Sequence, residues 1–321
     1  MSHGVGDHNA SRDALAPVTD PAHRALLARY LAGELSGEMV LMYWLKSSPD
    51  VDALRTDLDA VVVACAQDAT SGAAVRNAME ALAALLSRNY EGCVRIAHML
   101  RSGVDNDDPA RSVEEGIAFC RKLFDWSVTQ SPESSVALYS LGSAEILESA
   151  TAEIVALFGT WRIIGRDRDL LEIGCGTGRF QRALSPQVRT ITGIDVSAKM
   201  IEVAHRRCSA IANITVLQCP GRDLSMFADD SFDLVFAVDS FPYLVQSGLP
   251  LVERHFTEAM RVLRRGGDFV ILELSYRGDA AQDLADVDRL AAATGFEVRV
   301  PGTQALSLWD GRAFHLTSTK A

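Results

Sequence analysis

The sequence lacks any apolar run long enough to cross a membrane as a helix, which takes ~20 consecutive residues. Its apolar stretches at 40–45 and 61–66 are short and indicate helices buried in a core. Residues 1–16 are polar and lack the apolar segment of a secretory signal peptide. We therefore expect a cytoplasmic protein with no membrane partner.

Paired cysteines are also missing. The six cysteines are scattered without a Cys-x-x-Cys spacing, so we expect reduced, mostly buried thiols and neither a disulfide framework nor a zinc site. His98 has no second ligating residue at a matching spacing, so no metal is expected.

Positive charge is scarce, with 31 Lys and Arg against 42 Asp and Glu and a net charge of −11. Proteins that grip a phosphate backbone usually present a basic face, so we expect no nucleic-acid partner. Hydrophobic residues make up 48% of the chain, enough for a substantial core. The length of 321 residues suits one large domain or two ordinary ones.

The first part of the sequence has the periodicity of helices only. Asp20 and Pro21 form a typical helix start, and Val75, Met79, Leu82 and Leu86 recur at helical spacing. A polar segment at 130–135 ends this region. We predict an all-α domain over residues 1–130 and a second domain over residues 131–321.

In the second domain, predicted strands alternate with helices, which favours a parallel α/β sheet. The expected helices are 199–207, 252–263 and 283–293. The expected strands are 170–173, 190–194, 214–219, 232–238, 268–274, 296–300 and 313–317.

The first of these strands runs into three glycines at alternate positions, Gly174, Gly176 and Gly178. Glycine tolerates positive φ and lets a ligand lie against the main chain, and amides at a helix start attract polar or anionic groups. The dinucleotide fingerprint needs a further glycine at position 179, which is Arg179 here. The spacing therefore disfavours an NAD site.

With Glu172 in front of it, this Gly-x-Gly-x-Gly loop closely resembles the first motif of class I S-adenosylmethionine-dependent methyltransferases, of the type 11 and type 25 kind. The resemblance covers roughly residues 135–321 and includes the phrases at 231–235 and 260–267. It implies a seven-stranded sheet in the order 3-2-1-4-5-7-6, with strand 7 antiparallel. The final pair of strands, with Asp310 and Gly311 between them, fits that pattern.

The resemblance also implies the cofactor S-adenosyl-L-methionine, with S-adenosyl-L-homocysteine as product. Asp195 would bind the ribose hydroxyls or, alternatively, cap a helix, and Glu172 would orient the cofactor's amino group or only the loop. Cys175 could equally be an apolar filler. The residues expected around the cofactor are Tyr139, Glu172, Gly174, Cys175, Gly176, Gly178, Asp195, Val196, Met200, Arg222, Asp223, Leu224, Asp239 and Ser240.

The acceptor is expected beside the segment Asp239-Ser-Phe-Pro-Tyr243, which lacks the adjacent prolines of DNA amino-methylating enzymes. We predict that Tyr243 and Trp309 bind the acceptor and that Tyr139 lies over the methionine part of the cofactor. The helices of 20–127 would wall the acceptor pocket, form a homodimer surface, or both. Among the conceivable bases Asp239, Tyr243, His255 and Tyr139, no spacing singles one out.

These patterns predict a methyltransferase that acts on the oxygen or nitrogen of a small-molecule acceptor. Two alternatives stay open: a partner subunit that binds the nucleoside cofactor without catalysis, and an NAD-dependent oxidoreductase.

Overall fold

The computed structural model describes residues 15–67, 72–102 and 112–320, and these divide into two compact units. The first unit holds the described residues before 104 together with 137–147 and 307–310. The second holds the described residues from 112 to 136, 148–306 and 311–320. Each unit thus combines segments that lie far apart in the sequence.

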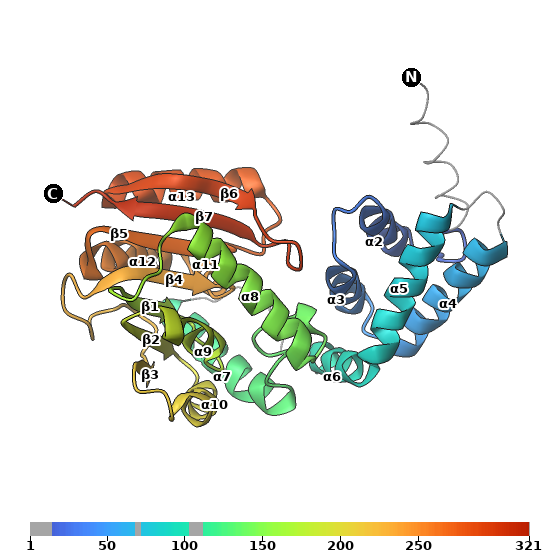
Figure 1. Ribbon diagram of the computed structural model, residues 1–321, viewed down its shortest axis with the longest axis horizontal. Coiled ribbons are helices and arrows are strands. Elements are labelled where there is room, and N and C mark those ends of the chain that lie inside the picture. Colours follow the sequence, from blue (N-terminus) through green and yellow to red (C-terminus); the bar gives the residue numbers. More distant parts are fainter. Residues whose placement is uncertain (1–14, 68–71, 103–111, 321) are drawn as a thin grey trace, which may run out of the picture. The chain divides into compact units, whose positions relative to one another are not determined.

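The first unit is helical, as the periodicity predicts. Asp20 accepts a hydrogen bond from the amide of Ala22 at 2.7 Å with Pro21 in the first turn, which confirms the predicted helix start. The helices, visible in Figure 1, are α2 Pro21–Leu31, α3 Gly37–Ser47, α4 Val51–Gln67, α5 Ala73–Arg88 and α6 Tyr90–Arg101, with the short η1 Leu138–Ser140.

Two later segments complete this unit. A Cβ on Gly92 of α6 would lie 1.8 Å from the carbonyl oxygen of Leu141, so glycine permits this close approach. The hydroxyl of Ser36 donates to the carbonyl of Leu308 at 2.9 Å, and the hydroxyl of Tyr43 donates to Asp310 at 2.8 Å.

The second unit contains a sheet with helices on its connections. Its helices are α7 Val113–Gln130, α8 Ala144–Trp161 (which begins in the first unit), α9 Arg179–Leu184, η2 Ser185–Gln187, α10 Ala198–Cys208, α11 Phe241–Gln246, α12 Leu249–Val262 and α13 Ala280–Thr294. Its strands are β1 Asp169–Ile173, β2 Thr190–Asp195, β3 Ile214–Gln218, β4 Phe232–Val238, β5 Leu263–Leu272, β6 Phe296–Gln304 and β7 Arg312–Ser318.

The strand order is β3-β2-β1-β4-β5-β7-β6, which confirms the predicted order (Figure 1). Strands β1 to β5 pair in parallel, and β7 runs antiparallel to both β5 and β6. The carboxyl ends of the parallel strands therefore share one edge, where open α/β sheets bind their ligands.

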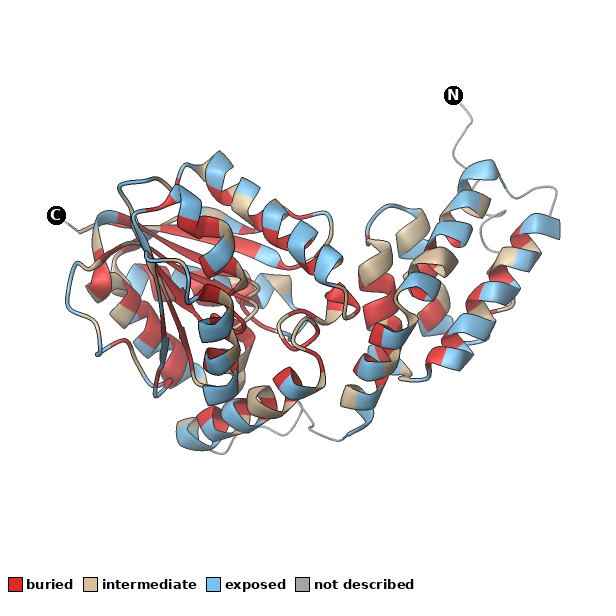
Figure 2. Ribbon diagram, turned by 60° about the horizontal axis from the view of Figure 1, so that its bottom comes forward, coloured by how far each residue is buried: buried red, intermediate tan, exposed pale blue. Residues whose placement is uncertain are grey.

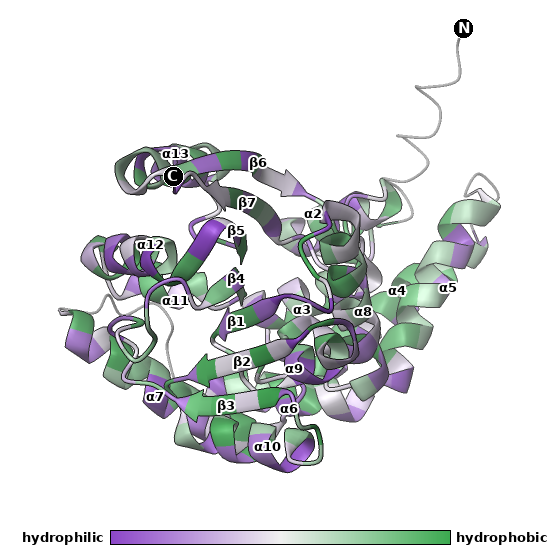
Figure 3. Cartoon of the chain, turned by 60° about the vertical axis from the view of Figure 1, so that its left-hand side comes forward, coloured by the Kyte–Doolittle hydropathy of each residue, from purple (hydrophilic) through white to green (hydrophobic). Residues whose placement is uncertain are grey.

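The core of this unit lies on the central strands, which are buried on both faces, as the red strands of Figure 2 show. Leu170, Leu171, Val235 and Phe269 are fully buried there. Helix α10 buries one side only, and hydrophobic and hydrophilic residues alternate along it in Figure 3.

Strands β5 and β6 have other bounds than expected. Strand β5 begins at Leu263 instead of 268, because Leu263 already pairs with Phe232 before a register shift. Strand β6 extends through Pro301, which an edge strand tolerates because its outer amides need no partner.

Helix α7 belongs to the second unit, where it packs against α10 and α11. The predicted division of the chain at residue 130 stays a prediction. No described helix is long and apolar enough to span a bilayer.

Candidate active site

The glycine loop leaves β1 as a tight left-handed path. Gly174, Gly176 and Gly178 have φ of 78°, 51° and 79°, values that favour glycine over any other residue. A Cβ on Gly174 would lie 2.5 Å from the Cβ of Ser240, whose hydroxyl donates to the carbonyl of Ile173 at 2.6 Å. The loops that follow β1 and β4 are therefore in direct contact.

The segment before the glycine loop in sequence also packs on it. A Cβ on Gly176 would meet Cγ1 of Val136 at 2.6 Å. Arg207 of α10 donates to the hydroxyl of Thr177 at 2.9 Å and forms a 3.0 Å ion pair with Glu133. Residues 133–136 are thus held against the loop from outside the sheet.

Asp195, at the end of β2, points its carboxylate into this loop. One oxygen accepts from the amide of Gly176 at 2.9 Å, and the other accepts from the amide of Ser197 at 2.8 Å. Burial raises the pKa of Asp195 to about 6, although both hydrogen bonds oppose that rise. The alternative role of Asp195 as a helix cap is excluded, because Ser197 caps α10 through the amide of Met200.

Glu172 is the second acid of the site and is buried on β1. It accepts a hydrogen bond from Nε2 of Gln181 at 2.7 Å, and burial raises its pKa to about 8. The other amide atom of Gln181, Oε1, is buried without a hydrogen-bond partner among the described residues. A cation placed beside this carboxyl would favour its charged form and lower its pKa.

The remaining residues predicted around the cofactor differ in their burial and in their contacts. Cys175 and Met200 are buried, and Val196 packs 2.6 Å from a Cβ placed on Gly221. After β3, the side chain of Arg222 is exposed, the carboxylate of Asp223 accepts from the amide and hydroxyl of Ser225, and Leu224 is part of the core. Their contacts with a cofactor stay predictions.

Helix α7 supplies residues that sequence reasoning missed. The carboxylate of Asp125 accepts from the hydroxyl of Ser197 at 2.6 Å and from the amide of Lys199 at 3.1 Å. Arg121 donates to the carbonyl of Val196 at 3.3 Å. Helix α7 therefore fixes the turn that carries Asp195, and nothing in its local sequence signals this.

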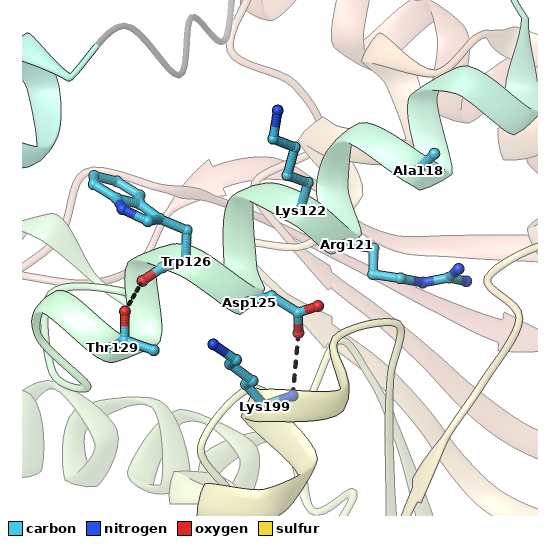
Figure 4. A pocket seen from close by; sticks show the side chains of 7 residues that line it. All are labelled: Ala118, Arg121, Lys122, Asp125, Trp126, Thr129 and Lys199. Atoms are coloured by element: carbon cyan, nitrogen blue, oxygen red, sulfur yellow. Dashed lines mark hydrogen bonds between the residues drawn. The ribbon is translucent and has the colours of Figure 1, made fainter.

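A surface pocket of about 400 Å³ lies where α7 meets α10. Figure 4 shows the side chain of Lys199 below that of Asp125, and a dashed line marks the hydrogen bond from the amide of Lys199 to the Asp125 carboxylate. The pocket is lined by Ala118, Arg121, Lys122, Asp125, Trp126, Thr129 and Lys199.

Polar and aromatic side chains gather after β4 and β5. Asp239 follows β4 with a φ of 57° and accepts a hydrogen bond from the hydroxyl of Tyr276 at 2.7 Å. The ring of Tyr243 meets that of Tyr276 edge-on at 5.8 Å and that of Phe124 at 4.9 Å. Tyr276 and Phe124 were not predicted as site residues, because nothing in the sequence sets them apart from other aromatic residues until the fold brings them beside Asp239 and Tyr243.

The other conceivable base of this unit, His255, is buried in α12. Its Nδ1 hydrogen-bonds the carbonyl of Leu251 at 2.9 Å, and burial lowers its pKa. His255 is therefore a neutral residue bonded within its own helix.

Tyr139 and Trp309 lie together in the first unit. Their rings stack with centroids 5.8 Å apart and an interplanar angle of 19°. Trp309 lies in the connection between β6 and β7, as predicted. The expected roles of the two residues at the cofactor and the acceptor stay predictions.

The described residues contain no group of three or more His, Cys, Asp or Glu arranged to hold a metal ion. All six cysteines are buried and unpaired with one another.

Comparison with known proteins finds a family match within the second unit. A family described as "Methyltransferase domain" matches residues 171–271. A demethylmenaquinone methyltransferase of Tropheryma whipplei is 33% identical over 108 residues, which cover 34% of this chain and 42% of that protein. A probable S-adenosylmethionine-dependent methyltransferase of Saccharomyces cerevisiae is 29% identical over 108 residues, covering 33% of this chain and 35% of that protein.

The chain thus spans less than half the length of either relative. Among solved structures, a phosphoethanolamine N-methyltransferase of Haemonchus contortus, in complex with phosphoethanolamine and S-adenosylhomocysteine, has a TM-score of 0.52 at 19% identity. That likeness covers 65% of this chain and 50% of the other, and it concerns the fold alone. The family match identifies a methyltransferase domain over residues 171–271, and the strand order is that of the class I methyltransferase fold.

Proposed function

We propose that this protein is an S-adenosylmethionine-dependent methyltransferase that methylates an oxygen or nitrogen atom of a small molecule. The observation that carries the proposal is the arrangement of Asp195, whose carboxylate is buried at the end of β2 and bonded to the amide of Gly176 in the glycine loop. A carboxylate there can accept a hydrogen bond from each of two ribose hydroxyls, because each of its oxygens has a second lone pair.

The residues of the site fit the cofactor's chemistry. Gly174, Gly176 and Gly178 give the loop a left-handed path packed closely on its neighbours, and the main-chain groups of this loop are those that we expect to meet the cofactor. Glu172 offers a buried carboxyl that accepts a hydrogen bond from Gln181, and it suits the ammonium of the methionine part. Asp195 suits the ribose, so the two acids match two different polar groups of one ligand.

When bound, the cofactor supplies a methyl group on a sulfonium, an excellent leaving group. Positioning of the acceptor therefore provides much of the rate, and this chain's residues have to bind, orient and exclude water. The contact between Ser240 and the glycine loop places the segment after β4 next to the cofactor loop. That segment is the natural location for the acceptor.

Three observations support a small acceptor. The net charge of −11 opposes a nucleic-acid substrate, and the segment Asp239-Ser-Phe-Pro lacks the paired prolines of enzymes that methylate DNA bases. The relative from Tropheryma whipplei is named for a small-molecule acceptor, demethylmenaquinone.

Calorimetry with S-adenosylhomocysteine and NAD tests the cofactor. We expect micromolar binding of S-adenosylhomocysteine and none of NAD, and the reverse result would contradict the proposal. Incubation of the full chain with methyl-labelled S-adenosylmethionine and a set of small phenols and amines tests the reaction. Cofactor binding without any labelled product would favour the non-catalytic partner subunit.

A further inference from the structure

Glu172 and Gln181 form a polar pair in the interior of the second unit. Nε2 of Gln181 donates a hydrogen bond to Oε2 of Glu172 at 2.7 Å. Glu172 is 2% exposed and Gln181 is fully buried. A hydrogen bond between two side chains that water does not reach is strengthened by the low dielectric constant of the interior. The Gln181 amide therefore fixes the orientation of the Glu172 carboxyl.

A glycine in the neighbouring strand makes this contact possible. Gly193 of β2 pairs with Glu172 of β1 in the sheet. A Cβ on Gly193 would lie 2.6 Å from Nε2 of Gln181 and 2.6 Å from the Cβ of Cys175. A glycine inside a strand often marks the close approach of another group, and here that group is the Gln181 amide. Any larger residue at position 193 would push the amide away from the carboxyl.

The other end of the Gln181 amide is unusual. Its Oε1 is buried and has no hydrogen-bond partner among the described residues. Buried polar atoms of folded proteins are nearly always paired, so an unpaired one calls for a physical reason. Glu172 can supply the missing donor, because a carboxyl group carries an O–H when it is protonated.

The amide of Gln181 can pair with Glu172 in either charge state. A charged carboxyl has acceptors only and takes an N–H from Nε2, the arrangement in the structure. A protonated carboxyl has one O–H, and a half-turn of the amide about its terminal bond would present Oε1 to that donor. The terminal torsion of glutamine is roughly two-fold, so both orientations of the amide are accessible. Oε1 then gains the partner that it otherwise lacks.

We propose that Gln181 is a positioning residue that pairs with Glu172 in both of its charge states. It thereby lets this buried acid release its proton to solvent when a ligand with an ammonium group binds beside it. The inference rests on the proposed methyltransferase function, in which Glu172 meets the ammonium of the methionine part. It makes the ammonium a group for which the site selects.

The charges around Glu172 favour such a change. Burial raises the pKa of Glu172 to about 8, and the hydrogen bond from the amide opposes that rise. Arg179 of α9 also favours the charged form, whereas Asp195 of β2 disfavours it. The thiols of Cys175 and Cys208 have pKa values raised by burial, so they stay neutral. Near pH 7 Glu172 therefore keeps its proton until a cation arrives.

Calorimetry on the full chain with two ligands tests the proposal. S-adenosylhomocysteine carries the ammonium, and 5′-methylthioadenosine is a similar nucleoside thioether without it. Between pH 7 and pH 8, above the pKa of Asp195, the wild type should bind S-adenosylhomocysteine about fivefold more tightly. This is the gain for releasing a proton held with a pKa of about 8. The affinity for 5′-methylthioadenosine should stay constant.

Gln181→Met keeps an unbranched side chain but removes both hydrogen-bonding atoms of the amide. It should raise the pH at which Glu172 ionises by about one unit, because the charged form loses its donor. Binding of S-adenosylhomocysteine should then weaken about tenfold at pH 7 and about twofold at pH 9. Binding of 5′-methylthioadenosine should not change.

Gln282→Met is the matched control. Nε2 of Gln282 donates to the carboxylate of Asp286 at 3.2 Å, so the variant removes the same kind of contact from α13. Both affinities should stay at their wild-type values in this variant. If the methionine variant of Gln181 does not fold, Gln181→Asn replaces it, because its amide lies one carbon closer to the backbone and withdraws from Glu172.

A double variant separates positioning from a purely structural role. In the background of Glu172→Gln, Gln181→Met should cause no loss that depends on pH, because the ionisable partner is gone. The role of Gln181 would be overturned by a loss of affinity that is equal at pH 7 and pH 9, equal for both ligands, or equally dependent on pH in that background.

The free protein tests the pair without any ligand. The decrease in Tm with rising pH should extend about one pH unit higher in Gln181→Met than in the wild type, and it should not do so in the Glu172→Gln background. Identical Tm profiles would overturn the role of Gln181 and leave the proposed function standing. Failure of the wild type to bind S-adenosylhomocysteine would overturn the proposed function itself.

Discussion

Asp125 on α7 and Asp195 at the end of β2 hold the same residue from two sides. The hydroxyl of Ser197 donates to Asp125 at 2.6 Å, and the amide of Ser197 donates to Asp195 at 2.8 Å. The charge of Asp125 also contributes to the raised pKa of Asp195, after burial. A helix outside the sheet therefore helps to position the carboxylate proposed to bind ribose, and its charge adds to the effect of burial on the pKa of that carboxylate.

Asp125→Ala should weaken S-adenosylhomocysteine binding by about 0.5–1.5 kcal/mol, the net worth of one hydrogen bond. Calorimetry at about pH 8, where Asp195 is ionised with or without the charge of Asp125, measures this. Lys122→Ala on the same helix is the control, because Lys122 lines the pocket where α7 meets α10. Equal affinities in the Asp125 variant and the control would show that the turn needs no support from α7.

Asp195→Ala should weaken cofactor binding by ~2–3 kcal/mol, because two charge-assisted hydrogen bonds to ribose hydroxyls are lost. The variant should remain folded, since burial of an acid at this position is itself unfavourable. Calorimetry with S-adenosylhomocysteine, checked by circular dichroism of the free protein, measures both. Undiminished affinity would mean that Asp195 only holds the glycine loop in place and does not bind the ribose.

Gly176→Val should abolish cofactor binding, because a β-branched residue does not accept a φ of 51° and its side chain would enter the space between the loop and Val136. Gly176→Ala allows a sharper comparison with the double variant Gly176→Ala, Val136→Ala. The double variant relieves the 2.6 Å contact but keeps the backbone strain. Partial recovery of affinity in the double variant would show how much of the loss comes from the contact with Val136 and how much from the positive φ at position 176. Full affinity in Gly176→Ala would contradict both causes.

The stability of the free protein should fall as pH rises, because of Glu172. Its pKa is raised by burial from 4.5 to about 8, so the folded state binds this proton more tightly than the unfolded chain. The stabilisation is complete below the unfolded value and is lost as pH rises through about 8. Asp195 adds a similar loss of stability, which is complete once the pH is above its pKa of about 6.

Glu172→Gln should therefore remove the decrease in Tm between pH 6 and 8, measured by calorimetric unfolding without cofactor. Binding of S-adenosylhomocysteine to the wild type at neutral pH should also release protons, because an ammonium beside Glu172 favours its charged form. Buffers of different ionisation enthalpy report that release. Parallel curves of Tm against pH for the wild type and Glu172→Gln would contradict the role of this carboxyl.

The sequence predicts the sheet well, because its signals are local. The apolar run before Gly174, the alternate glycines and the acid at position 195 each follow from neighbouring residues. Strand order was accessible only through resemblance to a family, and it is confirmed. The end of β6 was missed, because Pro301 usually terminates a strand unless that strand lies at an edge.

The site was only partly predictable, for a physical reason. Asp125, Phe124 and Tyr276 act through contacts with Ser197, Tyr243 and Asp239, which lie 37 to 119 positions away along the chain. A single sequence carries no record of such pairs. Asp125 looks like any exposed acid on an amphipathic helix until the fold brings Ser197 beside it.

The way the chain passes between its two units has a consequence for synthesis on the ribosome. The helical unit includes residues 307–310, and Ser36 and Tyr43 find their partners in Leu308 and Asp310, 272 and 267 positions later. Those contacts form only after nearly all of the second unit has been translated. The helices that are synthesised first therefore lack these hydrogen-bond partners until residues 307–310 have been synthesised.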